Sequence, residues 1–373
     1  MELNQIAKFI FKVFAMAFFA MICFFVMVFM FSLLFIGAGI GISSGISSLN
    51  IHEAAPEKTA YEYLAGSSDS KNLLLQIDVE GLILGRLPAG LDLQFEFMGV
   101  SAGYDIKETL QDAALDDNIK GVILRLQTPG GTIFGSMAIF DGVKEFQEKT
   151  KKPVLAYVEG MSASGGLMAM AGSDAIYADY GSLVGSIGIL GPEIIYYNKP
   201  MATDGGIIGG GIVTQGGIES NQIHAGRGKD FGNPFRKATE EELSVMQQGL
   251  DAEYDNFVAH VARNRKIAES VIRETMGAHI FDNKTAKELG LIDGTLDYHS
   301  CLDKLASLSK VGSDYKVVIP REPPSKYLEH LFNICFPGRM QSSKESFRKY
   351  LAATIFKSPL AFHGDLEEIS RDY

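Results

Sequence analysis

The chain has 373 residues, with 34 Lys and Arg against 45 Asp and Glu, which gives a formal net charge of −11. This acidic balance argues against nucleic acid as a partner, because nucleic-acid binding rests on a cationic surface. The cysteines Cys23, Cys301 and Cys335 allow at most one Cys301–Cys335 bridge, no Cys and His cluster has metal-ligand spacing, and there is no P-loop, so we expect no cofactor.

Residues 13–41 contain no charged residue. About 20 apolar residues cross a bilayer as a helix, and a cleavable signal peptide has a shorter apolar core, so we predict a retained transmembrane signal-anchor. Lys8 and Lys12 precede the segment, and such residues favour the cytoplasmic side. We therefore expect residues 1–46 to hold a cytoplasmic stub and the anchor in the cell membrane, with the rest outside the cytoplasm. The polar, Ser- and Gly-rich residues 47–70 indicate a linker.

Apolar runs and helical patterns then alternate. The predicted strands are 73–81, 121–127, 153–160 and 175–179, and the predicted helices are 106–115, 134–146 and a segment after Ser164. This alternation predicts parallel βαβ units in an α/β fold, with helices packed on the sheet. We expect the folded domain to occupy residues 71–310.

Ser164 lies between a predicted strand and the apolar run LMAMA, which we expect to be helical. Gly165 and Gly166 follow, and such small residues let a substrate backbone approach closely. Free N–H groups are found at a helix N-terminus, which suits an oxyanion. The segment TPGG at 128–131 repeats this strand-to-helix arrangement, so its glycine N–H groups are candidates for a second donor. We expect the neighbouring Ser162 to face away and pack the turn.

A serine hydroxyl needs a base to take its proton, and Lys229 in HAGRGKD is the candidate. Because an ordinary lysine is protonated at pH 7, we hypothesise that Lys229 is buried in the assembled enzyme without a paired carboxylate. The adjacent Asp230 is expected to point to the opposite face of the segment. A Ser-His-Asp triad with His224 as base is the competing chemistry, but Ser164 lacks the second glycine of a G-x-S-x-G elbow.

Two further segments follow the candidate base. Residues 239–242, Thr-Glu-Glu-Glu, predict a capping box that opens a long amphipathic helix, with apolar positions recurring from Leu243 to Val261. We assign residues 311–373 to a C-terminal tail, in which two apolar stripes predict short amphipathic helices. These helices either pack on the domain or dock on anionic lipid.

The ordered motifs TPGG, SASGG, GSIGI and Gly-Lys-Asp resemble the signal peptide peptidase A family of Ser–Lys membrane serine proteases, in its short, single-domain form. The resemblance covers roughly Leu73 to Asp293. It implies a Clp protease/crotonase-like superhelix of ββα units and a homo-oligomer, in which neighbouring copies can contribute the serine and the lysine of one site.

By this resemblance, Ser164 is the nucleophile and Lys229 is the general base. Ser186 of GSIG holds the lysine by a hydrogen bond, and the backbone N–H groups of Gly131 and Gly165 form the oxyanion hole. The ordinary alternatives are that Ser164 is a small turn residue and Lys229 a solvated loop residue.

The implied function is a membrane-anchored serine endopeptidase that degrades hydrophobic peptides, such as cleaved signal peptides. Two alternatives stay open. One is a related membrane protease that cuts a specific, stomatin-like partner. The other is a crotonase-like acyl-CoA enzyme or non-proteolytic scaffold, which would need neither Ser164 nor Lys229.

Overall fold

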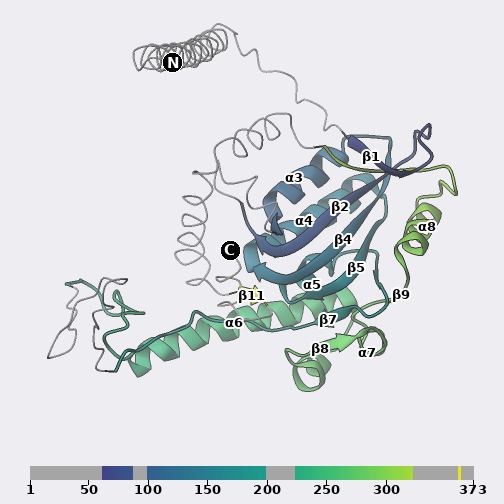
Figure 1. Ribbon diagram of the computed structural model, residues 1–373. Coiled ribbons are helices and arrows are strands. Elements are labelled where there is room, and N and C mark those ends of the chain that lie inside the picture. The colour runs from purple at the N-terminus through teal and green to yellow at the C-terminus, as the bar shows by residue number, and fades with distance from the viewer. Residues whose placement is uncertain (1–60, 87–98, 199–222, 322–359, 363–373) are drawn as a thin grey trace, which may run out of the picture. The chain divides into compact units, whose positions relative to one another are not determined.

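A computed structural model describes residues 61–86, 99–198, 223–321 and the backbone of 360–362 (Figure 1). The chain divides into two compact units, Met1–Lys58 and Thr59–Tyr373, and all described residues belong to the second. The predicted anchor and the apolar stripes of the predicted tail lie outside the described residues. Within the described ranges, no helix combines the length and the apolar character that a membrane span requires.

One mixed sheet organises the described part of the chain, with the main strand order β1-β10-β2-β4-β5-β6-β9. The strands are β1 Tyr61–Gly66, β2 Leu73–Leu84, β3 Val100–Ala102, β4 Ile119–Thr132, β5 Val154–Ala163, β6 Ala175–Ala178, β7 Leu183–Gly185, β8 Ile280–Asp282, β9 Gly294–Thr295, β10 Lys316–Pro320 and β11 Leu360–Phe362. The four strands expected from the sequence, β2, β4, β5 and β6, pair in parallel. The α/β class is therefore confirmed.

Helices follow the strands as the alternation predicts. They are α3 Gly103–Ala113, α4 Ile133–Thr150, α5 Gly165–Met170, α6 Glu240–Arg265, α7 Asn283–Glu288, α8 Tyr298–Leu308 and the π-helical turn η2 Val271–Met276. The predicted helices at 106–115 and 134–146 correspond to α3 and α4, with shifted ends. The predicted capping box is present, because Thr239 and Glu242 each accept the other's backbone N–H group.

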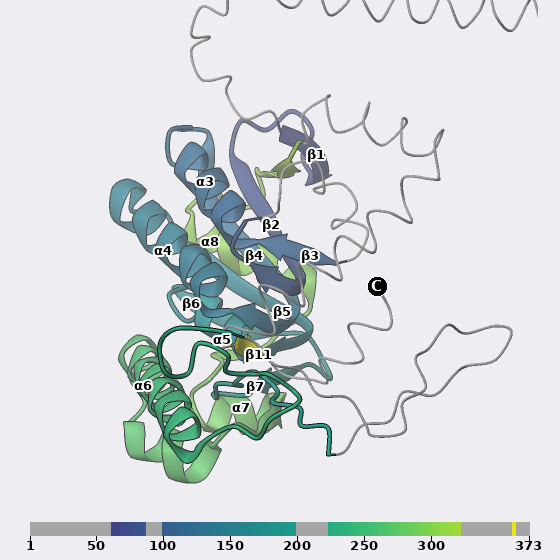
Figure 2. The ribbon, with the colours of Figure 1, turned by 90° about the vertical axis from the view of Figure 1, so that its left-hand side faces the viewer.

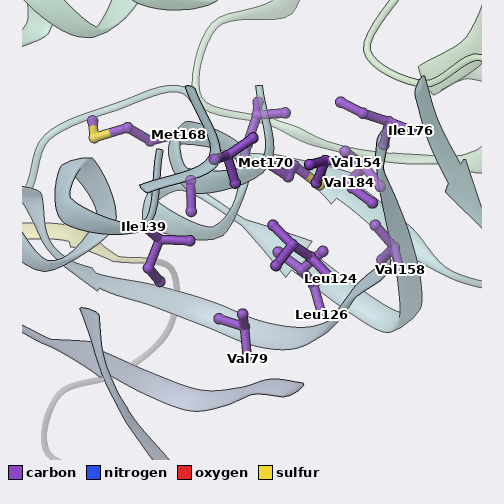
Figure 3. Packing of buried hydrophobic residues seen from close by; sticks show 14 of the residues in the cluster. Val79, Leu124, Leu126, Ile139, Val154, Val158, Met168, Met170, Ile176 and Val184 are labelled. Atoms are coloured by element: carbon purple, nitrogen blue, oxygen red, sulfur yellow. The ribbon is translucent and has the colours of Figure 1, made fainter. Parts of the chain in front are cut away.

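Alternate residues of the central strands contribute to two hydrophobic cores, one on each face of the sheet. Val79 and Leu124 pack with Ile139 of α4 in the larger core, part of which is seen in Figure 3. Leu74 and Leu155 pack with residues of α8 on the other face. Side chains of neighbouring strand residues point to opposite faces, so both faces must be covered. The sheet thereby becomes a rigid base for the loops at its strand ends.

The sheet continues past both predicted domain limits. Residues 61–66 were expected in the 47–70 linker, and residues 316–320 in the 311–373 tail. Instead β1 pairs antiparallel with β10, which pairs in parallel with β2. Burial explains the correction, because Val317 is fully buried and the two strands cover an edge of β2 that would otherwise be unpaired.

Candidate functional site

Ser164 forms a sharp turn between β5 and α5. Its backbone has φ 52° and ψ −112°, a conformation that residues with side chains rarely adopt. The turn is held because the Ser164 N–H donates to the Gly185 carbonyl at 2.8 Å, and its own carbonyl accepts from the Met168 N–H at 3.0 Å. A strained serine between a strand and a helix is the geometry of a nucleophile elbow, formed here without the G-x-S-x-G sequence.

Ser162 packs beneath this turn, as expected. It has no exposed surface, and a Cβ added at Gly166 would come within 2.7 Å of its Oγ and 2.6 Å of the Thr128 Cγ2. Only glycine therefore fits at position 166. Ser162 thus differs in role from Ser164, although both lie in SASGG.

Ser186 lies beside Ser164 because β7 pairs in parallel with the end of β5, with Gly185 opposite Ala163. The carboxyl ends of parallel strands meet at one edge of a sheet. Ser186 is 4% exposed, also has a positive φ of 60°, and its N–H donates to the His279 carbonyl at 2.7 Å. The chain then turns so that Ser164 Oγ lies 3.5 Å from the Gly188 carbonyl oxygen that accepts its hydrogen bond.

Gly131 and Gly165 lie at the same edge of the sheet as Ser164 and Ser186. The last pair between β4 and β5 joins Thr128 to Ser162, and Gly131 continues β4 beyond it. A Cβ at Gly131 would come within 2.0 Å of the Ile83 carbonyl oxygen, so glycine is required there. Gly165 is the first residue of α5. The structure therefore gathers four predicted site residues, Ser164, Ser186, Gly131 and Gly165, at adjoining strand ends.

Lys229 lies elsewhere, on an exposed loop at the beginning of α6. Arg236 fastens this loop, with Nη2 at 2.7 Å from both Asp230 and Glu242. The hydrogen bond from Arg236 lowers the pKa of Asp230 to about 2 and is also the main cause that lowers the pKa of Glu242 to about 2. The Asp230 carboxylate, 8% exposed, is therefore occupied by Arg236 and by His224 at 3.4 Å.

The other end of α6 packs under the Ser164 turn. His260 Nε2 lies 2.9 Å from the carbonyl oxygen of Met168, in α5, and its ring packs edge-on against Phe140. His260 is thus a packing residue. From Glu242 to His260 the helix advances by 18 residues, about 27 Å at 1.5 Å per residue.

Ser164 and Lys229 of one chain are therefore roughly 20 Å or more apart, several times the reach of a lysine side chain. Figure 1 shows this end of α6 projecting beyond the edge of the sheet. His224 lies on the same loop as Lys229, so it does not complete a triad with Ser164 of its own chain either. Within one chain, the Ser164 hydroxyl therefore lies apart from both candidate bases, Lys229 and His224.

We call the projecting part, residues 191–198, 223–239 and 240–253, the α6 arm. Its segments run side by side in Figures 1 and 2, and the Tyr197 N–H donates to the Pro234 carbonyl at 2.8 Å. Its surface exposes the apolar side chains Ile195, Tyr196, Tyr197, Leu243 and Val245. A groove of about 790 Å³ between the loop and α6 is lined in part by Phe231, Met246 and Leu250.

Sequence reasoning did not identify Arg236 or this apolar surface. Arg236 matches no motif, although the capping box placed its partner Glu242 at the start of a helix. The helical stripe from Leu243 to Val261 predicted an amphipathic helix without indicating which part of its apolar face is covered. In the structure only Phe257, Val258 and Val261 of α6 are buried.

Comparison with known proteins adds independent information. Residues 146–312 match the model of Peptidase family S49. The chain is 35% identical over 204 residues to MJ0651 of Methanocaldococcus jannaschii, named as a candidate protease, covering 55% of this chain and 61% of that protein. It is 28% identical over 246 residues to an Enterococcus faecium protein named as a candidate signal peptide peptidase, SppA, covering 66% of each.

Among solved structures, a mutant of the membrane-bound stomatin-specific protease 1510-N matches with 15% identity and a TM-score of 0.39. The match covers 67% of this chain and 97% of that chain. This chain spans less than two thirds of the length of the two curated relatives.

Proposed function

We propose that the chain is a serine endopeptidase that uses Ser164 as nucleophile and Lys229 as general base, because residues 146–312 match the model of Peptidase family S49. The observation that supports this role for Ser164 best is its strained backbone at the junction of β5 and α5. Strain of this kind costs on the order of 1–3 kcal/mol and persists where function requires it. An inactive scaffold would have no use for it.

The proposed reaction is acyl transfer. Neutral Lys229 takes the proton of Ser164 Oγ as the oxygen attacks the substrate carbonyl carbon, and the N–H groups of Gly131 and Gly165 stabilise the oxyanion. Protonated Lys229 then gives this proton to the leaving amine as the peptide C–N bond breaks. In the second half, neutral Lys229 takes a proton from water as the water oxygen attacks the acyl carbon. It then gives this proton to Ser164 Oγ as the ester bond breaks and the acyl product leaves. Ser186 positions the lysine amine by a hydrogen bond.

We propose that the dyad forms between two copies of the chain. The separation of Ser164 and Lys229 within one chain leaves a neighbouring copy as the source of the base. The apolar surface of the α6 arm is the kind of patch that protein interfaces cover, and its groove can accept side chains of a neighbour. A head-to-tail contact of this type builds a closed ring when the rotation between copies closes. Burial in that contact would also remove Lys229 from water.

For the substrate we propose hydrophobic peptides at a membrane, such as cleaved signal peptides. The uncharged segment at residues 13–41 supports a single-pass anchor, and Lys8 and Lys12 support a cytoplasmic N-terminus with the protease domain outside. The relative named as a candidate signal peptide peptidase points to the same class of substrate. The parallel βαβ units are compatible with the expected Clp protease/crotonase-like superhelix.

The test is turnover of a fluorogenic apolar peptide by the full chain in detergent micelles. Ser164→Ala and Lys229→Ala should each lower kcat at least about 10³-fold, because a catalytic dyad acts as a unit. Ser162→Ala is the matched control and should keep wild-type turnover. Turnover retained in Ser164→Ala would contradict the proposal, and turnover retained only in Lys229→Ala would make His224 the candidate base. A protease restricted to one partner protein would leave this peptide uncut but cleave that protein.

A further inference from the structure

Strand β4 contains a β-bulge just before the glycine assigned to the oxyanion hole. Glu80 of β2 lies opposite Gln127 of β4, but Leu82 lies opposite Gly130, so three steps along β4 match two along β2. A bulge of this kind locally disrupts the backbone hydrogen bonds between two strands. Pro129 lies in the bulge and has no N–H group to donate. Another group must therefore hold the two strands together at this point.

The Thr128 side chain spans the bulge. Its Oγ1 donates to the Gly81 carbonyl of β2 at 2.5 Å and accepts from the Gly130 N–H at 3.0 Å. Thr128 is 1% exposed, so water does not compete for either bond. Gly130 is held with a φ of 106°, which residues with side chains rarely adopt. The hydroxyl thus fixes the direction in which the chain leaves the bulge towards Gly131.

The methyl group of the same side chain faces the nucleophile turn. Thr128 Cγ2 lies within 2.6 Å of where a Cβ at Gly166 would be, so it packs directly against the backbone there. Gly166 belongs to α5, the helix that begins directly after Ser164, and α5 contacts β4. One buried side chain therefore joins the strand of Gly131 to the helix of Gly165.

We propose that Thr128 is a positioning residue that sets the spacing between the two N–H groups of the oxyanion hole. Its hydroxyl acts on the Gly131 side and its methyl group on the Gly165 side. The inference rests on the proposed protease function. An oxyanion hole works because its donors are already aimed at the place where negative charge develops. Gly131 and Gly165 belong to different elements, so their spacing depends on the groups that join those elements.

A misplaced donor affects the transition state more than the bound substrate. The oxyanion forms only during reaction, so a change of spacing is expected to lower kcat and leave KM unchanged. A displacement of about 1 Å costs roughly 10²-fold in rate.

The test compares three variants of the full chain. Thr128→Val keeps the branched shape but removes the hydroxyl, and Thr128→Ser keeps the hydroxyl but removes the methyl group. Ser101→Ala is the matched control, because Ser101 Oγ accepts from the Glu80 N–H at 2.8 Å and donates to the Glu80 carbonyl at 2.9 Å. It removes two hydrogen bonds beside the same bulge, but on the β3 side of β2, since Leu82 pairs with β3 on one side and with β4 on the other.

Turnover of the fluorogenic apolar peptide gives kcat and KM, and a peptide aldehyde serves as the second probe. Ser164 Oγ adds to the aldehyde carbon, the hydroxyl proton passes to Lys229, and the former carbonyl oxygen becomes an oxyanion in the hole. We expect Thr128→Val to lower kcat about 10²-fold with KM within about twofold, and to weaken aldehyde binding by a similar factor. Thr128→Ser should lose at most about tenfold in kcat, and Ser101→Ala should match wild type in all three values.

An equal loss of kcat in Ser101→Ala and Thr128→Val would overturn the inference, because any weakening of the bulge would then suffice. A change of KM alone in Thr128→Val would overturn it as well. If Thr128→Val does not fold, Thr128→Cys replaces it, since a thiol is only a weak donor and acceptor. Thr128→Cys differs from Thr128→Ser in one atom, and equal kcat values in these two variants would contradict a role for the hydroxyl.

Hydrogen exchange of residues 126–134, followed by mass spectrometry in the Ser164→Ala background, separates the two proposals. Thr128→Val should speed exchange in this segment, whereas Ser101→Ala should not. Faster exchange in Thr128→Val, together with no turnover by the wild-type chain, would contradict the protease function and retain the Thr128 link. Wild-type turnover, with exchange and kcat both unchanged in Thr128→Val, would contradict the link and retain the protease function.

Discussion

Ser164 has no exposed surface and lies at the end of a central strand, whereas Lys229 lies on an exposed loop at the far end of α6. The backbone of Ser164 is held in a strained conformation by hydrogen bonds to Gly185 and Met168. Lys229 is placed by a loop that Arg236 ties to the first turn of the helix. The proposed nucleophile is thus held by the fold of one chain. The proposed base lies on a separate part of the chain that can be presented to another copy.

The two halves of α6 repeat this contrast. Phe257, near the C-terminal end, is 1% exposed and packs in the larger core, while Leu243, near the N-terminal end, is 46% exposed. Both residues belong to one apolar stripe. The half near Ser164 therefore stabilises the fold, and the half near Lys229 offers an apolar surface to a partner.

The largest effect on stability is expected at Phe257. Phe257→Ala removes a fully buried ring and should lower the free energy of unfolding by about 3–5 kcal/mol. Leu243→Ala, on the same helix, should change it by less than about 0.5 kcal/mol. Chemical denaturation followed by circular dichroism measures both values. Similar losses in the two variants would mean that the arm is covered within its own chain.

The next effect concerns the position of Lys229. Arg236→Ala removes the link between Asp230 and Glu242 and leaves the Lys229 loop without its fastening. We expect about a tenfold loss of kcat/KM, or 1.4 kcal/mol, with the core still folded. Arg236→Lys retains the positive charge but not the forked contact with both carboxylates. Its kcat/KM should therefore lie between those of wild type and Arg236→Ala. Wild-type turnover in Arg236→Ala would mean that the loop does not need this fastening.

The strain at Ser164 gives a smaller effect. Glycine adopts positive φ without penalty, whereas alanine keeps the strain. Ser164→Gly should therefore be more stable than Ser164→Ala by about 1 kcal/mol, and we expect both to be inactive. The difference in unfolding midpoint between the two variants measures it. If Ser164→Gly were the less stable variant, the turn would not be strained.

The smallest effect is expected from a change of pH between 8 and 5, which should leave the ionisation of Asp230 and Glu242 unchanged. The pKa values of Asp230 and Glu242 are lowered to about 2 in the folded chain, chiefly by hydrogen bonds from Arg236. A carboxylate with a lowered folded pKa stabilises the fold when ionised. This contribution is complete above the unfolded values of about 4 and is lost as the pH falls towards 2.

Carbon NMR titration of these carboxyl groups should therefore show no change between pH 8 and 5. In Arg236→Ala both midpoints should rise towards 4. Midpoints near 4 in the unmodified chain would show that Arg236 does not hold the two carboxylates.

Much of the fold could be predicted because its signals are local. The runs that became β2, β4 and β5 are apolar and continuous, as strands buried on both faces require. SASGG predicted the Ser164 turn, and Thr239 with Glu242 predicted the start of α6. In each case the residues that carry the signal are neighbours in the chain.

The remaining features depend on contacts between distant residues. β1 and β10 pair with each other across the whole domain, and the three residues of β11 carry no pattern of their own. The apolar stripe of α6 shows that one face of the helix is apolar. It does not show which half of that face packs against the rest of the chain. For the same reason, the sequence placed Ser164 and Lys229 in one site without showing that one chain keeps them apart.

The most direct test of the account mixes two inactive proteins. Ser164→Ala and Lys229→Ala are dissociated, combined in equal amounts and reassembled, and turnover of the apolar peptide is measured. If each site takes its serine and its lysine from different copies, about a quarter of the sites regain both groups by random assortment, and turnover returns to about that fraction of wild type. If both groups came from one chain, no site would regain its dyad, and a mixture as inactive as its components would contradict the account.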